Sequence, residues 1–288
     1  MDHNLLQRMK SIRQTVQISS AQKLVAAAHI GKARKLLEES DTYHKNVSRA
    51  IADILRHCPG ISSQYLPGFK VGKKRGLLVL SANKGLAGGY NSNVIHFTEA
   101  SLAEDSAAYM IVLGQARSYF IHKGYPVDQD YYQPLDPPTM FTARELAEKI
   151  MGMLDSGEVD IFDVIHTSYR SSVKLQVVQR RLFPLDPDAF TGEFDEESNK
   201  AHYTFEPSPE QVLHFVASKY LKGYLYGCLI HTWLCELTAR VTAMDNAVRN
   251  GNEMLAHLSL VYNRARQASI TQEITEIVAG AAAMVTEE

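Results

Sequence analysis

The first segment of the sequence lacks proline over a length that a compact domain cannot contain. Residues 3–57 hold no proline and only one glycine, Gly31. Apolar residues there recur at alternating steps of four and three, at Leu5, Met9, Ile12 and Val16. This periodicity predicts one amphipathic helix, which Pro59 and Gly60 would end. At 1.5 Å per residue, such a helix would be on the order of 80 Å long.

The last segment has the same character. After Pro209 no further proline occurs, so we predict a second helix, on the order of 100 Å long. Its apolar positions again alternate by four and three, with a five-residue step that is typical of a stutter: Met254, Leu258, Val261, Ala265, Ile270, Ile274, Ile277, Ala281 and Met284. Two such helices are expected to pair as an antiparallel coiled coil. The alternative is two shorter, broken helices packed on a globular core.

The sequence between these helices is typical of an α/β domain. Residues 76–82 and 108–114 are short, continuously apolar runs, as in strands that are buried on both faces. Further strands are expected at 160–170 and 173–185, pairing antiparallel at one edge, and residues 186–202 are predicted to form an exposed loop. Helical patterns lie between the strands, around 93–105, 115–124 and 142–157. This alternation predicts a Rossmann-like, mainly parallel α/β domain inserted between the strands of the coiled coil.

The predicted architecture divides the chain into three parts. Residues 1–57 would form the N-terminal coiled-coil helix, residues 58–207 the inserted α/β domain, and residues 208–288 the C-terminal coiled-coil helix. A protruding two-helix rod buries little surface for its length, so we expect a partner protein to cover it.

Composition excludes several classes of protein. The net charge of −2 gives no reason to expect nucleic-acid binding. Residues 1–35 nevertheless carry seven cations against one acid, which predicts either a solvated helix face or a surface that meets an acidic partner. The three cysteines form no CxxC pair and are expected to be reduced thiols, without a metal site. The most apolar window, residues 223–237, is shorter than a membrane span and is expected to be a buried helix.

The segment SANKGLAGGYNSN, residues 81–93, follows a predicted strand and precedes a predicted helix. Glycines in that position hold phosphate in many nucleotide enzymes. Here Lys84 precedes the glycines, no GK[ST] follows, and the GxGxxG spacing is absent. We therefore predict a tight turn with positive φ or close backbone approach, with Asn91 or Ser92 as the N-cap of the next helix.

No other pattern in the sequence predicts catalysis. GxSxG, HExxH and HxE…CxxC motifs are absent, and the eleven histidines are scattered singly. On the last helix, Arg266, Gln267, Thr271 and Glu273 are spaced so that they could share one flank beside the apolar stripe. That flank is either a solvated surface or a polar latch onto a covering partner.

Four segments resemble one family, the gamma subunits of F-type ATP synthases. The C-terminal LVYNRARQASITQEITEIVAGAAAM resembles the family's terminal signature, with ITQE, the acid Glu276 and GAAA. SANKGLAGGYNSN is similar to its RGLCGG(F/L)N motif, SIRQTVQISSAQKLVAAA to SVxNTxxITKAMxMVAA, and ELTARVTAMDNAVRN to SExxARMxAMxxATDN. The resemblance spans the whole chain, in order.

This resemblance implies a coupling element without catalytic, cofactor or metal sites of its own. In the family, the coiled coil is the central rotor shaft inside a ring of three alpha and three beta subunits. The α/β domain lies outside that ring, beside the epsilon subunit and the membrane c-ring. The implied location is the cytoplasmic side of a bacterial cell membrane, peripheral, with no direct insertion into the bilayer and no nucleic-acid partner.

The family's functional positions transfer to residues of this chain. The latch onto the beta subunit corresponds to Arg266, Gln267, Thr271 and Glu273, and the arginine of the coupling segment to Arg240. The c-ring-facing stretch corresponds to Tyr203 and Glu206. The apolar bearing tip corresponds to the end of the last helix, with Ile277, Val278, Ala281 and Met284.

The chain also departs from the family's motifs. ITKAM is replaced by ISSAQ, which puts Ser20 and Gln22 where the family has lysine and methionine. Lys84, Val241 and Val248 are further departures at or near coupling positions. Two alternative functions remain at this level: an α/β nucleotide-binding enzyme with helical arms, and the shaft of another type of rotary ATPase.

Overall fold

The computed structural model describes residues 2–68, 74–132, 137–170, 175–193 and 204–285. Two compact units make up the chain: residues 27–240, and residues 1–26 together with 241–288. Both long helices contribute residues to both units. The elements are α1 (Asp2–His57), β1 (Arg75–Leu80), α2 (Tyr90–Glu104), β2 (Tyr109–Leu113), α3 (Ala116–His122), α4 (Met140–Ser156), β3 (Ile161–Tyr169), β4 (Leu175–Phe183), the 3₁₀ helix η1 (Pro187–Glu193) and α5 (Pro209–Val285).

The unit of residues 27–240 is built on a four-stranded sheet in the order β2-β1-β3-β4. β1 pairs parallel with both β2 and β3, and β4 pairs antiparallel with β3 at the edge. Continuous apolar runs form the central strands because both faces of the sheet are covered. The predicted Rossmann-like, mainly parallel sheet with one antiparallel edge strand is confirmed.

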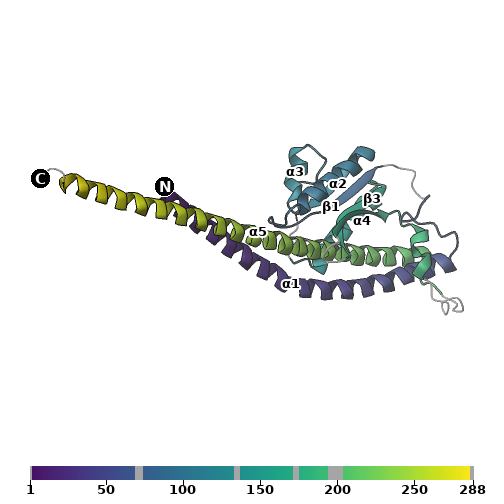
Figure 1. Cartoon of the computed structure of the whole chain (residues 1–288). Coiled ribbons are helices and arrows are strands. Elements are labelled where there is room, and N and C mark those ends of the chain that lie inside the picture. The colour runs from purple at the N-terminus through teal and green to yellow at the C-terminus, as the bar shows by residue number, and fades with distance from the viewer. Residues whose placement is uncertain (1, 69–73, 133–136, 171–174, 194–203, 286–288) are drawn as a thin grey trace. The chain divides into compact units, whose positions relative to one another are not determined.

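Two apolar cores cover the two faces of this sheet. α2 and α3 pack on one face, where Val79, Val112 and Phe120 are buried. α4 packs on the other face with the sheet-proximal parts of α1 and α5, around Leu78, Ile111 and others. Figure 1 shows α2 and α3 on the side of the sheet opposite α4. Alternation of buried side chains along each strand thus divides the core into two layers.

Residues 186–202 differ in part from the predicted exposed loop. Residues 187–193 form η1, and Phe190 is 4% exposed. Its ring packs against Tyr220 with centroids 5.5 Å apart. Among the described side chains of this segment, Phe190 is the buried one. The acidic composition of the segment gave no indication of its burial. Residues 194–202 lie outside the described residues.

Within the same unit, α1 and α5 run antiparallel. His29 lies near Trp233, with ring centroids 6.2 Å apart, and His44 lies near Tyr220, at 5.1 Å. The residue numbers of the contacting pairs thus increase along α1 while they decrease along α5, as in an antiparallel pair. Gly223 allows a close approach, since a Cβ there would lie 2.4 Å from the ring of Tyr43.

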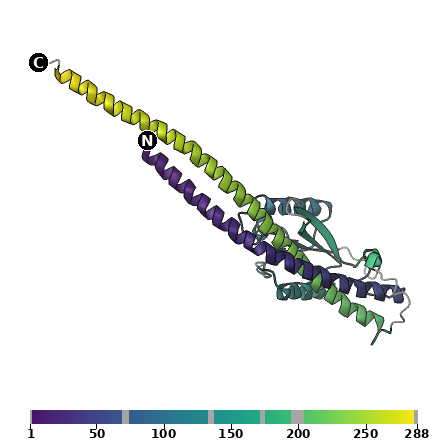
Figure 2. The ribbon, with the colours of Figure 1, turned by 60° about the horizontal axis from the view of Figure 1, so that its bottom comes forward.

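The unit of residues 1–26 and 241–288 is a two-helix antiparallel pair (Figure 2). Lys23 forms an ion pair with Asp245 at 2.5 Å, and Val16 lies against Gly251. The predicted stripe on α1 is confirmed, because Leu5, Met9, Ile12 and Val16 are half-buried among exposed neighbours. α1 and α5 also end within a residue or two of the predicted long helices.

The register predicted on α5 is partly wrong. Leu258 and Ala265 do lie on the covered seam, but Met254 and Val261 are exposed, at 45% and 36%. The seam instead follows residues that include glycine and tyrosine, which an apolar count overlooks: Met244, Val248, Gly251, Leu255, Leu258, Tyr262 and Ala265. These positions alternate by four and three, as a coiled-coil seam requires.

Other expectations have simple outcomes. All three cysteines are free thiols. None of the described helices combines length with enough apolar character to cross a membrane. α1 ends at His57 and α5 begins at Pro209, but the division of the chain into three parts stays a prediction.

Candidate functional site

The glycine-containing segment after β1 forms a turn, as predicted. Leu86 has φ of 63° and Gly88 has φ of 60°, both in the left-handed region. The predicted N-cap is wrong, because α2 begins at Tyr90 and no side chain caps it. Asn91 instead accepts a hydrogen bond from the Ala82 N–H at 2.9 Å. The asparagine therefore ties the two ends of the turn together.

The turn presents successive backbone N–H groups to a carboxylate from α5. The Asn83 N–H donates to Glu236 Oε2 at 2.9 Å, and the Lys84 N–H donates to Glu236 Oε1 at 3.2 Å. Successive N–H groups in a turn form an anion-binding concavity. Glu236 is 3% exposed, so a side chain of the protein occupies the position that a phosphate takes in nucleotide-binding turns.

Sequence reasoning missed the role of Glu236. Its partners lie more than 150 residues earlier in the chain. The available signal was an acid inside the most apolar window of the sequence, since buried carboxylates are rare unless they are paired. That signal predicts burial and a partner, but it does not identify the turn.

Arg240, the predicted coupling residue, extends the same contact. It lies one helical turn beyond Glu236 and forms an ion pair with it. Its Nη2 also donates to the carbonyls of Lys84 and Gly85, each at 3.2 Å. Glu236 and Arg240 thus satisfy both the N–H and the C=O groups of the turn and fix it to α5. We call Glu236, Arg240 and residues 83–85 the turn clamp.

The turn clamp stabilises the fold only when both of its buried charges are present. Glu236 and Arg240 are 3% and 8% exposed, and taking such charges out of water is costly. The cost is offset because each charged group has backbone partners in addition to the other charge. Removing the side chain of Glu236 or of Arg240 alone would leave the other charge buried without its ion-pair partner. That change is far more destabilising than removing both charges.

The four predicted latch residues are all exposed on α5: Arg266, Gln267, Thr271 and Glu273. At about 3.6 residues per turn, they do not share one flank as expected. Arg266 and Glu273 lie on one side of the stripe Ile270, Ile274 and Ile277, while Gln267 and Thr271 lie on the other. Polar groups therefore border an apolar stripe on both sides.

The stripe itself has no covering helix in the described chain. Its isoleucines Ile270, Ile274 and Ile277 are 43%, 56% and 71% exposed. All residues from 266 to 279 are exposed, because α5 continues beyond the point where α1 begins (Figures 1 and 2). An uncovered apolar stripe on a helix is typical of a surface that a partner covers.

The other predicted positions are less informative. Val278 is 61% exposed at the predicted bearing tip. Ala281 and Met284 belong to α5, but their side chains lie outside the described residues. Glu206 is exposed just before α5, and Tyr203 lies outside the described residues. The structure thus brings Arg240 to the turn and leaves the four predicted latch residues exposed to solvent.

Comparison with known proteins adds an independent finding. A family model described as ATP synthase matches residues 3–284. The ATP synthase gamma chain of Ruminiclostridium cellulolyticum is 41% identical over 283 residues, covering 96% of each chain. The ATP synthase gamma chain of Acetivibrio thermocellus is 39% identical over 285 residues, covering 96% of this chain and 97% of the relative.

Solved structures share the fold at low sequence identity. A chain from the Euglena gracilis mitochondrial ATP synthase, in a structure of OSCP, F1 and c-ring, matches with a TM-score of 0.66 and 14% identity. That match covers 98% of this chain and 94% of the other. A chain from the central stalk and c-ring of the Tetrahymena thermophila mitochondrial ATP synthase matches with a TM-score of 0.56 and 18% identity.

Proposed function

Because the chain belongs to the family of the gamma chains of F-type ATP synthases, the central rotor stalk of that enzyme, we propose that it couples ion flow to catalysis by rotation. In this proposal, ion flow through the membrane ring turns the chain, and the turning chain drives ATP synthesis at an alpha–beta hexamer. Hydrolysis of ATP drives the reverse rotation. The observation that carries this proposal is the exposed stretch of α5 from residue 266 to 279.

The exposed stretch suits a shaft inside a sleeve of partner subunits. Its isoleucine stripe offers contacts without direction, since the hydrophobic effect depends on area rather than on angle. The flanking Arg266, Gln267, Thr271 and Glu273 offer directional hydrogen bonds. We assign these four residues to a latch onto a beta subunit, and Ile277, Val278, Ala281 and Met284 to a bearing tip.

The proposed partners are the alpha and beta subunits, three of each, the epsilon subunit and the membrane c-ring. The solved structures that share this fold support the assignment, because they are complexes of a central stalk with a c-ring and of OSCP, F1 and a c-ring. Tyr203 and Glu206 are assigned to the face that meets the c-ring. In the cell, the chain would lie peripherally on the cytoplasmic side of a bacterial membrane.

We further propose that the chain is not itself catalytic. The turn that resembles a phosphate cradle binds Glu236 rather than leaving its N–H groups open. In this proposal the nucleotides bind to partner subunits, and Arg240 acts in coupling by holding the turn to α5. The three-part division at residues 57 and 207 is kept as the functional division into helix, domain and helix.

The test of this function is assembly and rotation-dependent activity of the whole complex. The tagged full chain is co-expressed with alpha, beta and epsilon subunits of a related bacterium and purified through its tag. We expect a stoichiometric alpha–beta hexamer that hydrolyses ATP only when the chain is present. A chain that emerges without the hexamer contradicts the proposal.

A second measurement separates the shaft from a nucleotide-binding enzyme. The isolated full chain is titrated with ATP and with NAD by calorimetry. We expect no stoichiometric binding of either, because Glu236 fills the turn. Tight, stoichiometric binding to the isolated chain would contradict the non-catalytic assignment while leaving the assembly result unaffected.

A further inference from the structure

A cavity of about 190 Å³ lies inside the unit of residues 27–240, and no residue of the turn clamp is among those that line it. Its wall combines α1, α5 and the two edge-side strands, β3 and β4. Basic and imidazole side chains are prominent in this wall: His44, His166, His231, Arg170 and Arg180. Nothing in the proposed rotor function uses these residues.

His166 on β3 has an unsatisfied buried nitrogen. The residue is 5% exposed, and its Nδ1 has no hydrogen-bond partner within the described part of the chain. Buried side-chain nitrogens almost always have a hydrogen-bond partner, so an exception needs an explanation, and a polar occupant of the adjoining cavity is one. Leaving such an atom unpaired costs free energy that a polar occupant would recover.

The second histidine supplies a defined donor. His231 on α5 lies with its ring centroid 6.1 Å from that of His166. Its Nδ1 accepts a hydrogen bond from the Tyr169 N–H at 3.2 Å. The proton of the neutral imidazole is therefore on Nε2, which makes that atom a donor.

The charge around the cavity favours an anion over a metal ion. Arg170 and Arg180 are both exposed at its wall, and neither forms an ion pair with a carboxylate among residues 2–68, 74–132, 137–170, 175–193 and 204–285. Among the described residues of the wall, Asp41 is the one acid beside two arginines, which leaves a net positive charge there. No three potential metal ligands are grouped in the described part of the chain. Neighbouring Arg181, by contrast, is paired with Asp163.

We propose that this cavity binds a small free oxyanion with the size and charge of inorganic phosphate. Arg170 and Arg180 neutralise its charge, since guanidinium groups match the geometry of phosphate oxygens. His166 donates through Nδ1–H, which gives that buried nitrogen its missing partner. The volume is below the roughly 300–1,000 Å³ of sites for drug-sized ligands, which favours a small anion over a nucleotide.

The test uses the full chain labelled with ¹⁵N at histidine, titrated with sodium phosphate at constant ionic strength. Two-dimensional ¹H–¹⁵N spectra follow the ring nitrogens, and His166→Gln identifies the His166 signal by its loss. We expect a saturable shift of the His166 signal with phosphate and none with chloride. No saturable shift would overturn the proposal and leave water as the occupant.

Matched arginine variants test the specificity of that shift. Arg180→Gln should weaken phosphate binding about tenfold or more, because a hydrogen bond from a charged group is lost. Arg49→Gln is the control, since Arg49 is exposed on α1 and is not part of the cavity wall. It should leave the titration unchanged. Equal weakening in both variants would indicate a nonspecific charge effect and would overturn the proposal.

Discussion

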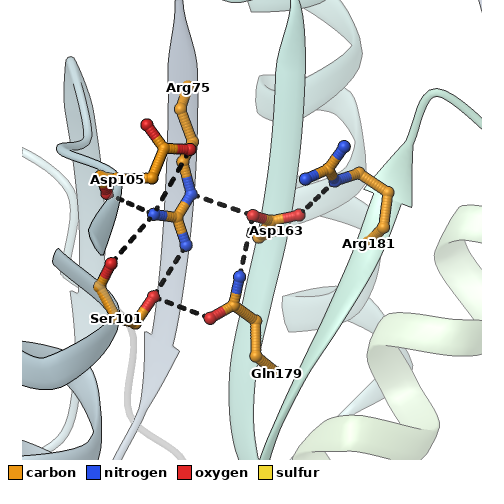
Figure 3. Close-up of polar contacts among 6 residues, drawn as sticks. All are labelled: Arg75, Ser101, Asp105, Asp163, Gln179 and Arg181. Carbon is orange, nitrogen blue, oxygen red and sulfur yellow. Dashed lines mark hydrogen bonds and ion pairs between the residues drawn. The ribbon is translucent and has the colours of Figure 1, made fainter.

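Arg75 on β1 and Asp163 on β3 form an ion pair at 2.9 Å between neighbouring parallel strands, with only 2% and 1% of their side chains exposed. Figure 3 shows that both charges have further partners. Asp163 also accepts hydrogen bonds from Gln179 and Arg181 on β4, while Arg75 donates to Ser101 Oγ at 2.9 Å. The network therefore connects three strands and α2 through buried polar groups.

Removing the carboxylate of this network should strongly destabilise the unit of residues 27–240. Asp163→Ala removes the buried carboxylate that pairs with Arg75 at 2.9 Å, and breaking a buried ion pair costs about 3–5 kcal/mol in comparable cases. The check is urea unfolding of the full chain, followed by the fluorescence of Trp233, its one tryptophan. The control is Asp105→Ala: Asp105 is 63% exposed and 3.8 Å from Arg75, so its loss should cost at most about 1 kcal/mol. Equal effects would contradict the account.

A double-mutant cycle should reveal strong coupling between Glu236 and Arg240. Each single replacement by alanine leaves a buried charge without its ion-pair partner, whereas the double replacement leaves none. The unfolding free energies should therefore be non-additive by about 1–3 kcal/mol. The control cycle uses Glu148 and Lys222, a solvent-accessible pair at 3.3 Å in which Glu148 is exposed and Lys222 half-buried, so their coupling should be below about 1 kcal/mol. Additivity at the turn clamp would mean that its ion pair contributes little.

Local periodicity accounts for most of what could be predicted from the sequence. The absence of proline and the four-three spacing predicted α1 and α5, and continuous apolar runs predicted the central strands. These signals depend on neighbouring residues only. The turn clamp could not be found in this way, since Glu236 meets Asn83 only after the chain has folded. The covered seam of α5 was misjudged because Gly251 contributes to it through its small size.

Gly251→Ala should destabilise the two-helix unit, although alanine favours helices. A Cβ at Gly251 would lie 2.4 Å from Val16 Cγ2, and such overpacking typically costs about 1–3 kcal/mol. Thermal unfolding monitored by helical circular dichroism measures the effect. Val16→Ala in the same chain should relieve the clash and recover part of the loss.

The matched control for this substitution is on the partner helix. A Cβ at Gly31 on α1 would meet nothing within 4 Å, so Gly31→Ala should stabilise the helix by up to about 1 kcal/mol. Stabilisation by Gly251→Ala to the same extent would show that the helices do not approach closely there.

His166 should make the stability of the protein depend on pH. Burial, and then the charges of His231 and Arg180, lower the pKa of His166 from 6.5 to about 3. Between these values the unfolded chain binds the proton and the folded chain does not. The contribution of His166 to the free energy of unfolding is therefore fully present above pH 6.5. It falls towards pH 3, by up to about 1.4 kcal/mol per pH unit.

The measurement is urea unfolding of wild type and His166→Gln between pH 5 and 7.5. The wild-type chain should lose more stability at pH 5 than the variant, by up to about 2 kcal/mol. Burial also lowers the pKa of His231, and the charge of Asp41 opposes that shift. Because His231 is present in both chains, its contribution to the pH dependence is common to both. His96→Gln is the control, because His96 is exposed on α2. Parallel pH profiles for wild type and His166→Gln would contradict the assignment.

The latch proposal predicts a loss of coupling from a double replacement on α5. Arg266→Ala together with Gln267→Ala removes polar groups from both sides of the isoleucine stripe, and each lost hydrogen bond weakens the contact by about 1 kcal/mol. With one hydrogen bond lost at each residue, about 2 kcal/mol in all, ATP-driven proton pumping by the reconstituted complex should fall by up to about thirtyfold. Gln272→Ala is the control, since Gln272 lies on the opposite face of the helix and donates a hydrogen bond to Glu276 at 2.9 Å.

Deletion of the residues after Ile277 should be tolerated better than the double replacement, because an apolar contact is spread over many atoms. Unchanged pumping in the double variant would remove Arg266 and Gln267 from the latch.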